Sequence, residues 1–239
     1  MRINYRLLCI TTIFSAFVCF SLNSFAQKPV IKNNHKEKYE TFSGFKSMDV
    51  GSVNKAGSAT GNNGTIEITA SGADIWGAKD AFHFCYKTIK GDFDISAQVS
   101  SVTETNLYTK AGFMARADLD ENSQHLFYLV FPTTVARHNN NGGCEFQYRL
   151  EKGGQMKAIY PDPATAGHQF DVAFPNTWIR LKRQGDVFES FMSSDGRDWK
   201  LYSSFTVKLP AELMVGLALT SHDKNGVATA KFASVKIKK

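Results

Sequence analysis

Apolar residues recur at every second position through most of the chain after residue 46. This period places alternate side chains on opposite faces of an extended strand. No stretch of helical length carries apolar residues at three- and four-residue spacing, so the pattern predicts an all-β chain of antiparallel strands. The clearest runs are Ile66 and Ile68; Phe93, Ile95, Ala97 and Val99; Ile179 and Leu181; and Val215, Leu217 and Leu219.

Turn residues separate these runs at short intervals, which leaves room for roughly a dozen strands. Each strand has one apolar face, as two stacked sheets require, so a two-sheet jelly-roll sandwich is favoured over a barrel. We expect one such domain over residues 46–239, because no proline-rich linker divides it. The turn segments include Gly61-Asn62-Asn63-Gly64, Lys90-Gly91-Asp92, Lys152-Gly153-Gly154, Gln184-Gly185-Asp186 and Asp223-Lys224-Asn225-Gly226.

The first 26 residues have the pattern of a secretory signal. Arg2 and Arg6 precede a largely apolar run, and Ser24 and Ala26 supply the small residues of a cleavage site. We therefore expect cleavage after Ala26 and export to the periplasm or the cell exterior. Residues 27–45 are polar and unpatterned, which indicates a linker or arm, and no later stretch reaches the ~20 apolar residues of a membrane span.

The net charge indicates which classes of ligand the chain can bind, and the cysteine count limits its disulfide bonding. The full chain has a formal net charge of +6 and loses two arginines and no acid with the signal, a balance too mild for nucleic acid but compatible with acidic glycans. Two cysteines follow the signal, Cys85 and Cys144. They form either a disulfide or, as the apolar run Phe82–Tyr86 around Cys85 favours, two buried thiols in adjacent strands.

The segment 72–84 is the first candidate for ligand binding. Asp74, Trp76, Asp80 and His83 could line a groove in which the indole stacks on a sugar and the carboxylates bond its hydroxyls or a calcium ion. The structural alternative is a glycine-rich bend whose aspartates bind loop amides. Two carboxylates six residues apart do not make a calcium loop, so we predict no metal.

Polar residues on three further strands form a second candidate. Lys110 and Arg116 alternate with small and apolar residues, as do Gln147 and Arg149, and His125 precedes an apolar run. If these rows share one sheet face, they make a strip suited to hydroxyl and carboxylate recognition. The alternative is a charged, solvated face.

A turn near the C-terminal third of the chain has a structural interpretation. Residues 193–199, Ser-Ser-Asp-Gly-Arg-Asp-Trp, resemble the Asp-box hairpin of secreted β proteins. We expect Asp195 to accept hydrogen bonds from backbone amides, Gly196 to adopt a positive φ, and Trp199 to pack under the turn.

Catalytic patterns are mostly missing, so we assign no catalytic residue and no cofactor. The sequence has no array of alternating acids as in sandwich glucanases and no Gly-x-Ser-x-Gly. The alternative to a binding protein is a polysaccharide lyase or glycoside hydrolase, since Tyr108 to Gly112 looks like the Tyr-x-Lys-Ala-Gly strand of some alginate lyases. That enzyme would use Tyr108, Lys110, His125 and Arg149, although Gln124 and His125 are adjacent here and the lyases' Arg-x-Glu-Leu-Arg strand is missing.

An ordered series of motifs from about Lys46 to Lys236 resembles a bacterial family. The motifs include residues 72–77, 80–84, 110–116, 193–199 and 215–222. The family is the concanavalin A-like lectin/glucanase domain of unknown function that is often labelled regulation-of-enolase-like. The resemblance implies a two-sheet sandwich, common in secreted proteins and attached to carbohydrate-active enzymes.

We therefore predict an exported carbohydrate-binding or accessory protein whose partner is a polysaccharide or other glycan. The alternative stays a lyase or hydrolase acting on an acidic or neutral glycan. The predicted ligand-binding residues are Trp76, His83, Lys110, Arg116, His125, Gln147, Arg149 and His222.

Overall fold

The computed structural model describes residues 44–137, 143–160 and 169–239, in which every regular element is a β-strand. The predicted signal 1–26 lies outside the described residues, as does nearly all of the predicted arm. The first strand begins at Lys46. Within the described ranges, no helix is long and apolar enough to cross a membrane.

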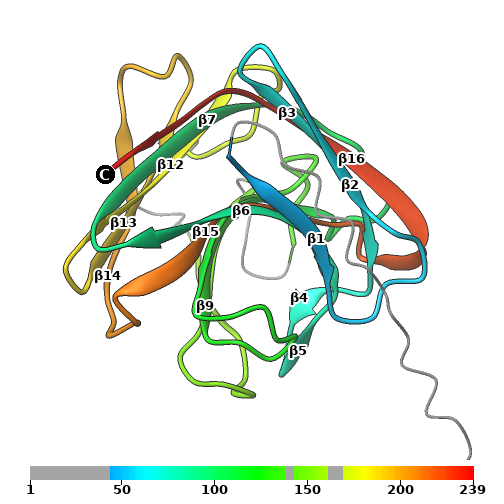
Figure 1. Cartoon of the computed structure of the whole chain (residues 1–239). Helices are drawn as coiled ribbons and strands as arrows, with labels where there is room; N and C mark the ends of the chain where they lie inside the picture. Colours follow the sequence, from blue (N-terminus) through cyan, green and yellow to red (C-terminus); the bar gives the residue numbers. More distant parts are fainter. Residues whose placement is uncertain (1–43, 138–142, 161–168) are drawn as a thin grey trace, which may run out of the picture. The chain divides into compact units, whose positions relative to one another are not determined.

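One sheet, called the β8 sheet after its central strand, has seven antiparallel strands in the described residues. Figure 1 labels its strands β1, β6, β15 and β9. Its order along the sheet differs from the order in the sequence, so neighbouring strands come from distant segments. The strands, in sheet order, are β1 (Lys46–Val50), β6 (Phe82–Lys90), β15 (Glu212–Thr220), β8 (Lys110–Arg116), β9 (His125–Val130), β10 (Cys144–Arg149) and β11 (Lys157–Ile159).

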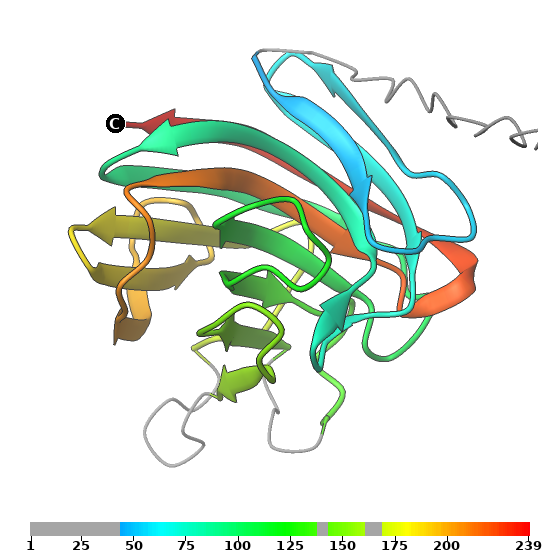
Figure 2. The same ribbon diagram turned by 60° about the horizontal axis from the view of Figure 1, so that its bottom comes forward.

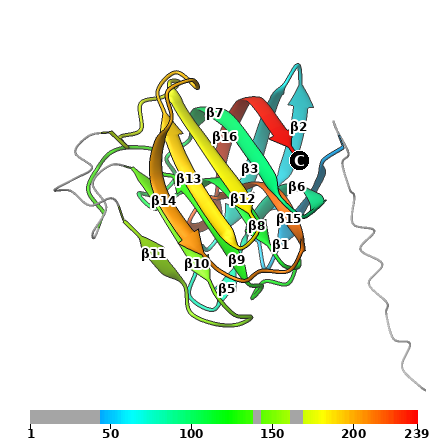
Figure 3. The ribbon, with the colours of Figure 1, turned by 90° about the vertical axis from the view of Figure 1, so that its left-hand side faces the viewer.

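The second sheet, called the β7 sheet, also has seven antiparallel strands among the described residues, and Figure 3 shows them side by side. The long strand β16 carries irregularities where its register with β3 and β7 shifts. In sheet order the strands are β14 (Lys200–Thr206), β13 (Val187–Ser193), β12 (Thr177–Gln184), β7 (Phe93–Val102), β16 (Asp223–Lys238), β3 (Thr65–Gly72) and β2 (Ser58–Asn62).

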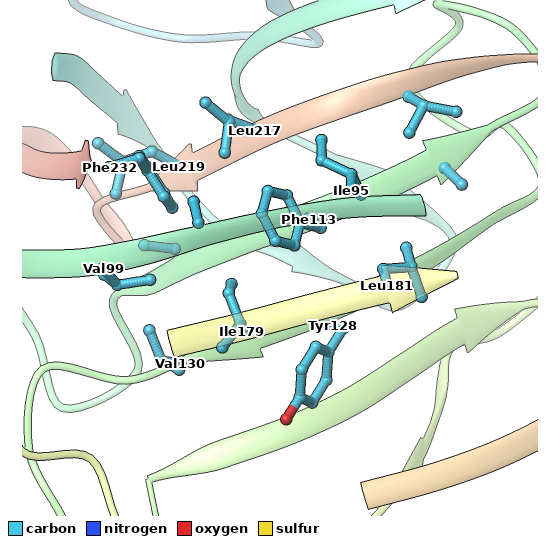
Figure 4. Close-up of a cluster of buried hydrophobic side chains, with 14 of the residues drawn as sticks. Ile95, Val99, Phe113, Tyr128, Val130, Ile179, Leu181, Leu217, Leu219 and Phe232 are labelled. Carbon is cyan, nitrogen blue, oxygen red and sulfur yellow. The ribbon is translucent and has the colours of Figure 1, made fainter. Parts of the chain in front are cut away.

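The two sheets stack as layers (Figure 2), and the alternating apolar residues of both fill the space between them. Ile95 and Ile179 come from the β7 sheet, and Phe113, Tyr128 and Leu217 face them from the β8 sheet (Figure 4). This core is the physical reason for the period-two pattern in the sequence. The predicted antiparallel two-sheet jelly-roll sandwich is confirmed.

The β8 sheet also buries apolar side chains on its outer face, which is turned away from the β7 sheet. Phe82, Phe84, Phe127 and Leu129 form a second apolar cluster there. A two-stranded hairpin, β4 (Ile75–Trp76) and β5 (Lys79–Asp80), lies on this side (Figure 1), and its Ile75 packs into the cluster. The hairpin and the loops beside it thus rise above the outer face of the sheet and surround part of it.

The two described cysteines are buried and unbridged. Cys144 Sγ donates to the hydroxyl of Tyr128 at 3.0 Å. The expectation of buried thiols holds, but not in adjacent strands, because β15, β8 and β9 separate β6 from β10. Burial raises the pKa of Cys85 to about 12 and that of Cys144 further still, so neither thiol is a nucleophile at neutral pH.

The turn at residues 193–199 corrects one detail of the prediction. Asp195 Oδ1 accepts hydrogen bonds from the amides of Arg197 and Asp198, and Gly196 has φ +71°, as expected. The ring under the turn is that of Trp178, because a Cβ at Gly196 would lie 2.8 Å from its indole. The sequence pointed to the nearer tryptophan, whereas strand pairing brings in the one from β12.

Candidate ligand-binding pocket

A cavity of about 290 Å³ opens on the outer face of the β8 sheet. Its floor is polar and comes from strands, since Lys110 on β8 and Glu145 and Gln147 on β10 alternate with residues of the inter-sheet core. Gln147 Nε2 donates to Glu145 Oε1 at 2.6 Å. The amide oxygen of Gln147 lies 3.4 Å from Lys110 Nζ, so the floor is one connected polar network.

Lys110 lies at the centre of this network and is only 2% exposed. Its ammonium donates to Asp74 Oδ1 at 2.7 Å and to the carbonyl of Ile75 at 2.9 Å. It also lies 5.2 Å from the centroid of the Trp76 ring, within the range of a cation–π contact. The lysine therefore joins the β4–β5 hairpin to the sheet and holds Asp74 and Trp76 at the pocket.

Asp74 is ionised at neutral pH. Burial by itself would raise the pKa of its carboxyl, but the charge of Lys110 and the side chains of His222 and Lys110 outweigh burial and lower it. His222 Nδ1 lies 3.2 Å from Asp74 Oδ1 and has no hydrogen-bond partner of good geometry among the described residues. Asp74 thus offers acceptor oxygens to a molecule in the pocket, and the buried His222 Nδ1 lies against Asp74.

The walls are aromatic. Trp76 is 39% exposed, which is unusual for so large an apolar side chain. Tyr108 contacts two other lining rings, with centroid distances of 5.5 Å to His222 and 6.2 Å to Phe131. Tyr160 lines the pocket as well, and burial together with the charge of Glu145 raises the pKa of its phenol, which stays protonated and able to donate.

Arg137 shapes the wall near Phe131. Its guanidinium carbon lies 4.4 Å from the centroid of the Phe131 ring. Its nitrogens donate to the backbone carbonyls of Leu107, Thr133 and Val135 at 2.6, 2.9 and 2.5 Å. Most of its donors are therefore used to order two loops, and its contribution to the pocket is mainly shape.

Four of the eight predicted residues meet in this pocket, namely Trp76, Lys110, Gln147 and His222. They come from β4, β8, β10 and the loop between β15 and β16. The other four, His83, Arg116, His125 and Arg149, are buried elsewhere.

Arg116, His125 and Arg149 surround Asp80 in a buried ionic cluster. Arg149 binds both carboxylate oxygens of Asp80 at 2.8 Å, and Arg116 Nη1 lies 3.5 Å from Oδ2. All four side chains are fully buried. The predicted strip therefore divides: Gln147 reaches the pocket, whereas Arg149, two residues further along β10, is sealed beneath the β4–β5 hairpin.

Most of the remaining donors of both arginines go to loop carbonyls. Arg116 donates to the carbonyls of Asp118 and Asp120 at 2.7 and 2.5 Å. Arg149 donates to those of Gly77 and Gly154 at 2.9 and 3.0 Å. The cluster thus fastens three loops to the sheet, including the tip of the hairpin that carries Trp76.

His125 is neutral within this cluster. Burial lowers its pKa to about 4, and the nearby Asp80 carboxylate offsets only part of that effect. The lyase alternative needs Tyr108 and Lys110 beside His125 and Arg149. The structure separates the pairs, because the first two line the pocket and the last two bind Asp80 or lie against it.

His83 faces the inner side of the β8 sheet, not the pocket. Its Nε2 lies 2.5 Å from Ser47 Oγ, and its Nδ1 lies 2.7 Å from Asp49 Oδ1. The three side chains resemble a charge relay, but Gly57 covers them, since a Cβ there would lie 2.4 Å from the His83 ring. Asp49 also accepts the Gly57 amide, so the group connects β1 to the segment before β2.

The sequence did not single out four lining residues, Phe131, Arg137, Glu145 and Tyr160. Glu145 could have been predicted, because it shares a strand face with Gln147. The other three lie outside the strands, where period-two reasoning does not apply. In the described part of the chain, no group of three or more His, Cys, Asp or Glu side chains could hold a metal ion.

Comparison with known families matches residues 53–239 to a family described as protein of unknown function, DUF1349. The chain belongs to this family. The match covers most of the described domain and includes every residue of the pocket. A comparison with curated proteins found no match.

Three solved structures are similar in fold. A functionally unknown protein from Saccharomyces cerevisiae has a TM-score of 0.59 at 14% identity over 80% of this chain and 95% of its own. Carbohydrate binding module CBM66 from Bacillus subtilis has 0.51 at 15% over 81% and 95%. A GH43 protein from Bacillus licheniformis, BlXynB carrying K247S, has 0.53 at 9%, over 74% of this chain and 33% of its own. The predicted concanavalin A-like sandwich is thereby confirmed as the fold of this DUF1349 chain.

Proposed function

We propose that this DUF1349 protein binds a carbohydrate in the pocket on the outer face of the β8 sheet. The observation that carries the proposal is the exposed ring of Trp76 beside the polar network of Asp74, Lys110 and Gln147. An aromatic face packs against the C–H groups of a sugar ring, and fixed carboxylate, ammonium and amide groups bond its hydroxyls.

The shared fold agrees with this proposal. The Bacillus subtilis structure is described as a carbohydrate binding module, and it covers four fifths of this chain. A common fold alone assigns no function, so the weight rests on the side chains of the pocket.

We also propose that the protein acts outside the cytoplasm. The support is the basic, apolar and small-residue pattern of residues 1–26. Intact mass measurement of the protein recovered from the periplasm or the medium would give a chain that begins at Gln27 if the proposal is right.

The decisive experiment is a binding measurement on Trp76→Ala. Covering the exposed part of the indole removes on the order of 60–100 Å² of apolar surface from water, or ~1.5–2.5 kcal/mol. Affinity gels and calorimetry with neutral and acidic polysaccharides should show binding by the wild type, and the variant should bind roughly 10- to 70-fold more weakly. Leu201→Ala is the matched control, because Leu201 is 51% exposed on β14, in the other sheet.

Two outcomes contradict the proposal. Wild-type protein that binds none of the polysaccharides has no carbohydrate site, and equal losses in Trp76→Ala and Leu201→Ala place the site elsewhere. The same preparations should be assayed for unsaturated uronic acid and for new reducing ends. Product formation that depends on Tyr108 would identify the pocket as the active site of a lyase or hydrolase instead.

A further inference from the structure

A second groove lies on the opposite side of the sandwich, on the outer face of the β7 sheet. Its volume is about 200 Å³. Cations from two strands line it, Arg180 from β12 and Lys236 and Lys238 from β16, and β7 contributes Ser96 between them. It shares no residue with the pocket of the β8 sheet.

The strand register brings these cations together. Ser96 on β7 is paired with Lys236 on one side and with Arg180 on the other. Paired residues point to the same face of a sheet, and neighbouring strands are about 4.8 Å apart. The two cations therefore flank the serine hydroxyl from positions roughly 10 Å apart, a spacing that an oxyanion and its first attached atoms can bridge.

One carboxylate lies in the groove, and Arg180 binds it. Arg180 Nε and Nη2 donate to the two oxygens of Asp94 at 2.8 and 2.5 Å. Lys236 and Lys238 have no carboxylate partner among the described residues, although Lys238 is paired in register with Asp94. The groove thus carries two lysine charges beyond those that Asp94 offsets.

Arg180 is held in place before any ligand arrives. Its guanidinium carbon lies 5.4 Å from the centroid of the Phe191 ring and 5.7 Å from that of Trp199. The ion pair uses Nε and Nη2 and leaves Nη1 without a hydrogen-bond partner in the described structure. A planar, ordered guanidinium with a free nitrogen is suited to oxyanion binding, because little side-chain entropy is lost.

We propose that this groove is a second binding site, specific for the acidic group of a polysaccharide, either a uronic carboxylate or a sulfate ester. Lys236, Lys238 and Arg180 Nη1 bind the acidic group, and Ser96 bonds the adjoining hydroxyls. Asp94 favours a glycan, because its carboxylate can accept hydrogen bonds from the sugar hydroxyls that adjoin the acidic group. The site is independent of the carbohydrate pocket proposed above.

The test measures binding of sulfated heparin oligosaccharides and of oligogalacturonates to the full mature chain by calorimetry at two salt concentrations. We expect Lys236→Gln with Lys238→Gln to weaken binding at least tenfold and to make it less dependent on salt. Lys55→Gln with Lys90→Gln removes the same charge from exposed positions outside the groove and should have little effect. Comparison of the two oligosaccharides shows whether sulfate or carboxylate is preferred.

Trp76→Ala should leave this binding unchanged, which separates the second site from the first. The proposal is overturned if neither oligosaccharide binds, if the control pair loses as much affinity as the groove pair, or if Trp76→Ala abolishes binding. Equal affinity for a single-stranded oligodeoxythymidylate would also overturn it, because the groove would then be a non-specific polyanion surface. Unchanged thermal unfolding of each variant ensures that lost binding is not lost folding.

Discussion

Replacing Asp80 by asparagine should strongly destabilise the protein. The substitution keeps the shape of the side chain but removes the only carboxylate among the described residues that lies within 4 Å of Arg116 and Arg149, and both guanidinium groups are fully buried. Removing one partner of a buried ion pair costs about 3–5 kcal/mol, since the remaining charge has no counterion. That loss is a large part of the ~5–15 kcal/mol by which folded domains are stable.

Urea denaturation followed by tryptophan fluorescence measures this effect, because the chain has three tryptophans. The midpoint should fall with little change in the m-value, and thermal unfolding should shift down by roughly 6–20 °C. Asp120→Asn is the matched control. Asp120 pairs with Lys152, and both side chains are more than half exposed, so its loss should change stability little.

Equal stability of the Asp80→Asn and Asp120→Asn variants would refute this reasoning. It would mean that the carbonyls of Gly77, Asp118, Asp120 and Gly154 satisfy the two guanidinium groups without a counterion. The destabilised variant should also bind carbohydrate less well, because the cluster holds the tip of the hairpin that carries Trp76.

Two further predictions concern pH and backbone strain. His125 has a folded pKa of about 4 against 6.5 in the unfolded chain, so only the unfolded state gains its proton between these values. The free energy of unfolding should therefore fall by about 3 kcal/mol as the pH drops through this window. In urea denaturation of His125→Gln, the free energy of unfolding should depend less steeply on pH over the same window. Gly196→Ala should cost about 1–3 kcal/mol in the same measurement, because Gly196 has φ +71° and no room for a Cβ. Gly91→Ala, with φ +87° and open space around it, should cost less.

Strand periodicity predicted the fold because two stacked sheets require each strand to have one apolar face, and the period-two pattern shows that face. From Phe93 to Val99, each inward position of β7 is buried and each outward one is not, and the sequence shows that alternation directly. The order of strands in the sheets is a different matter. It depends on pairings between distant segments, such as β15 between β6 and β8, that no local pattern records.

The candidate site was half predictable for a related reason. Alternation placed Arg116, Gln147 and Arg149 on outward positions, and the structure puts them on that face. Nothing in the local pattern revealed that a hairpin far away in the sequence covers one end of the face and brings Asp80 to the arginines. The tertiary contact therefore decided which of the polar residues face solvent.

Strand β8, which carries Lys110 of the pocket floor, and its neighbour β9 have no solvent-facing positions. Every residue of β8 and of β9 is buried, since the core lies on one side and the second apolar cluster on the other. Substitutions in these strands disturb packing whichever way the side chain points. Change in ligand preference between descendants of such a chain must therefore enter through the hairpin and loops that carry Asp74, Trp76, Tyr108 and His222. The buried strands tolerate few substitutions, whereas the hairpin and loops at the edge of the pocket can change in sequence without disturbing the core.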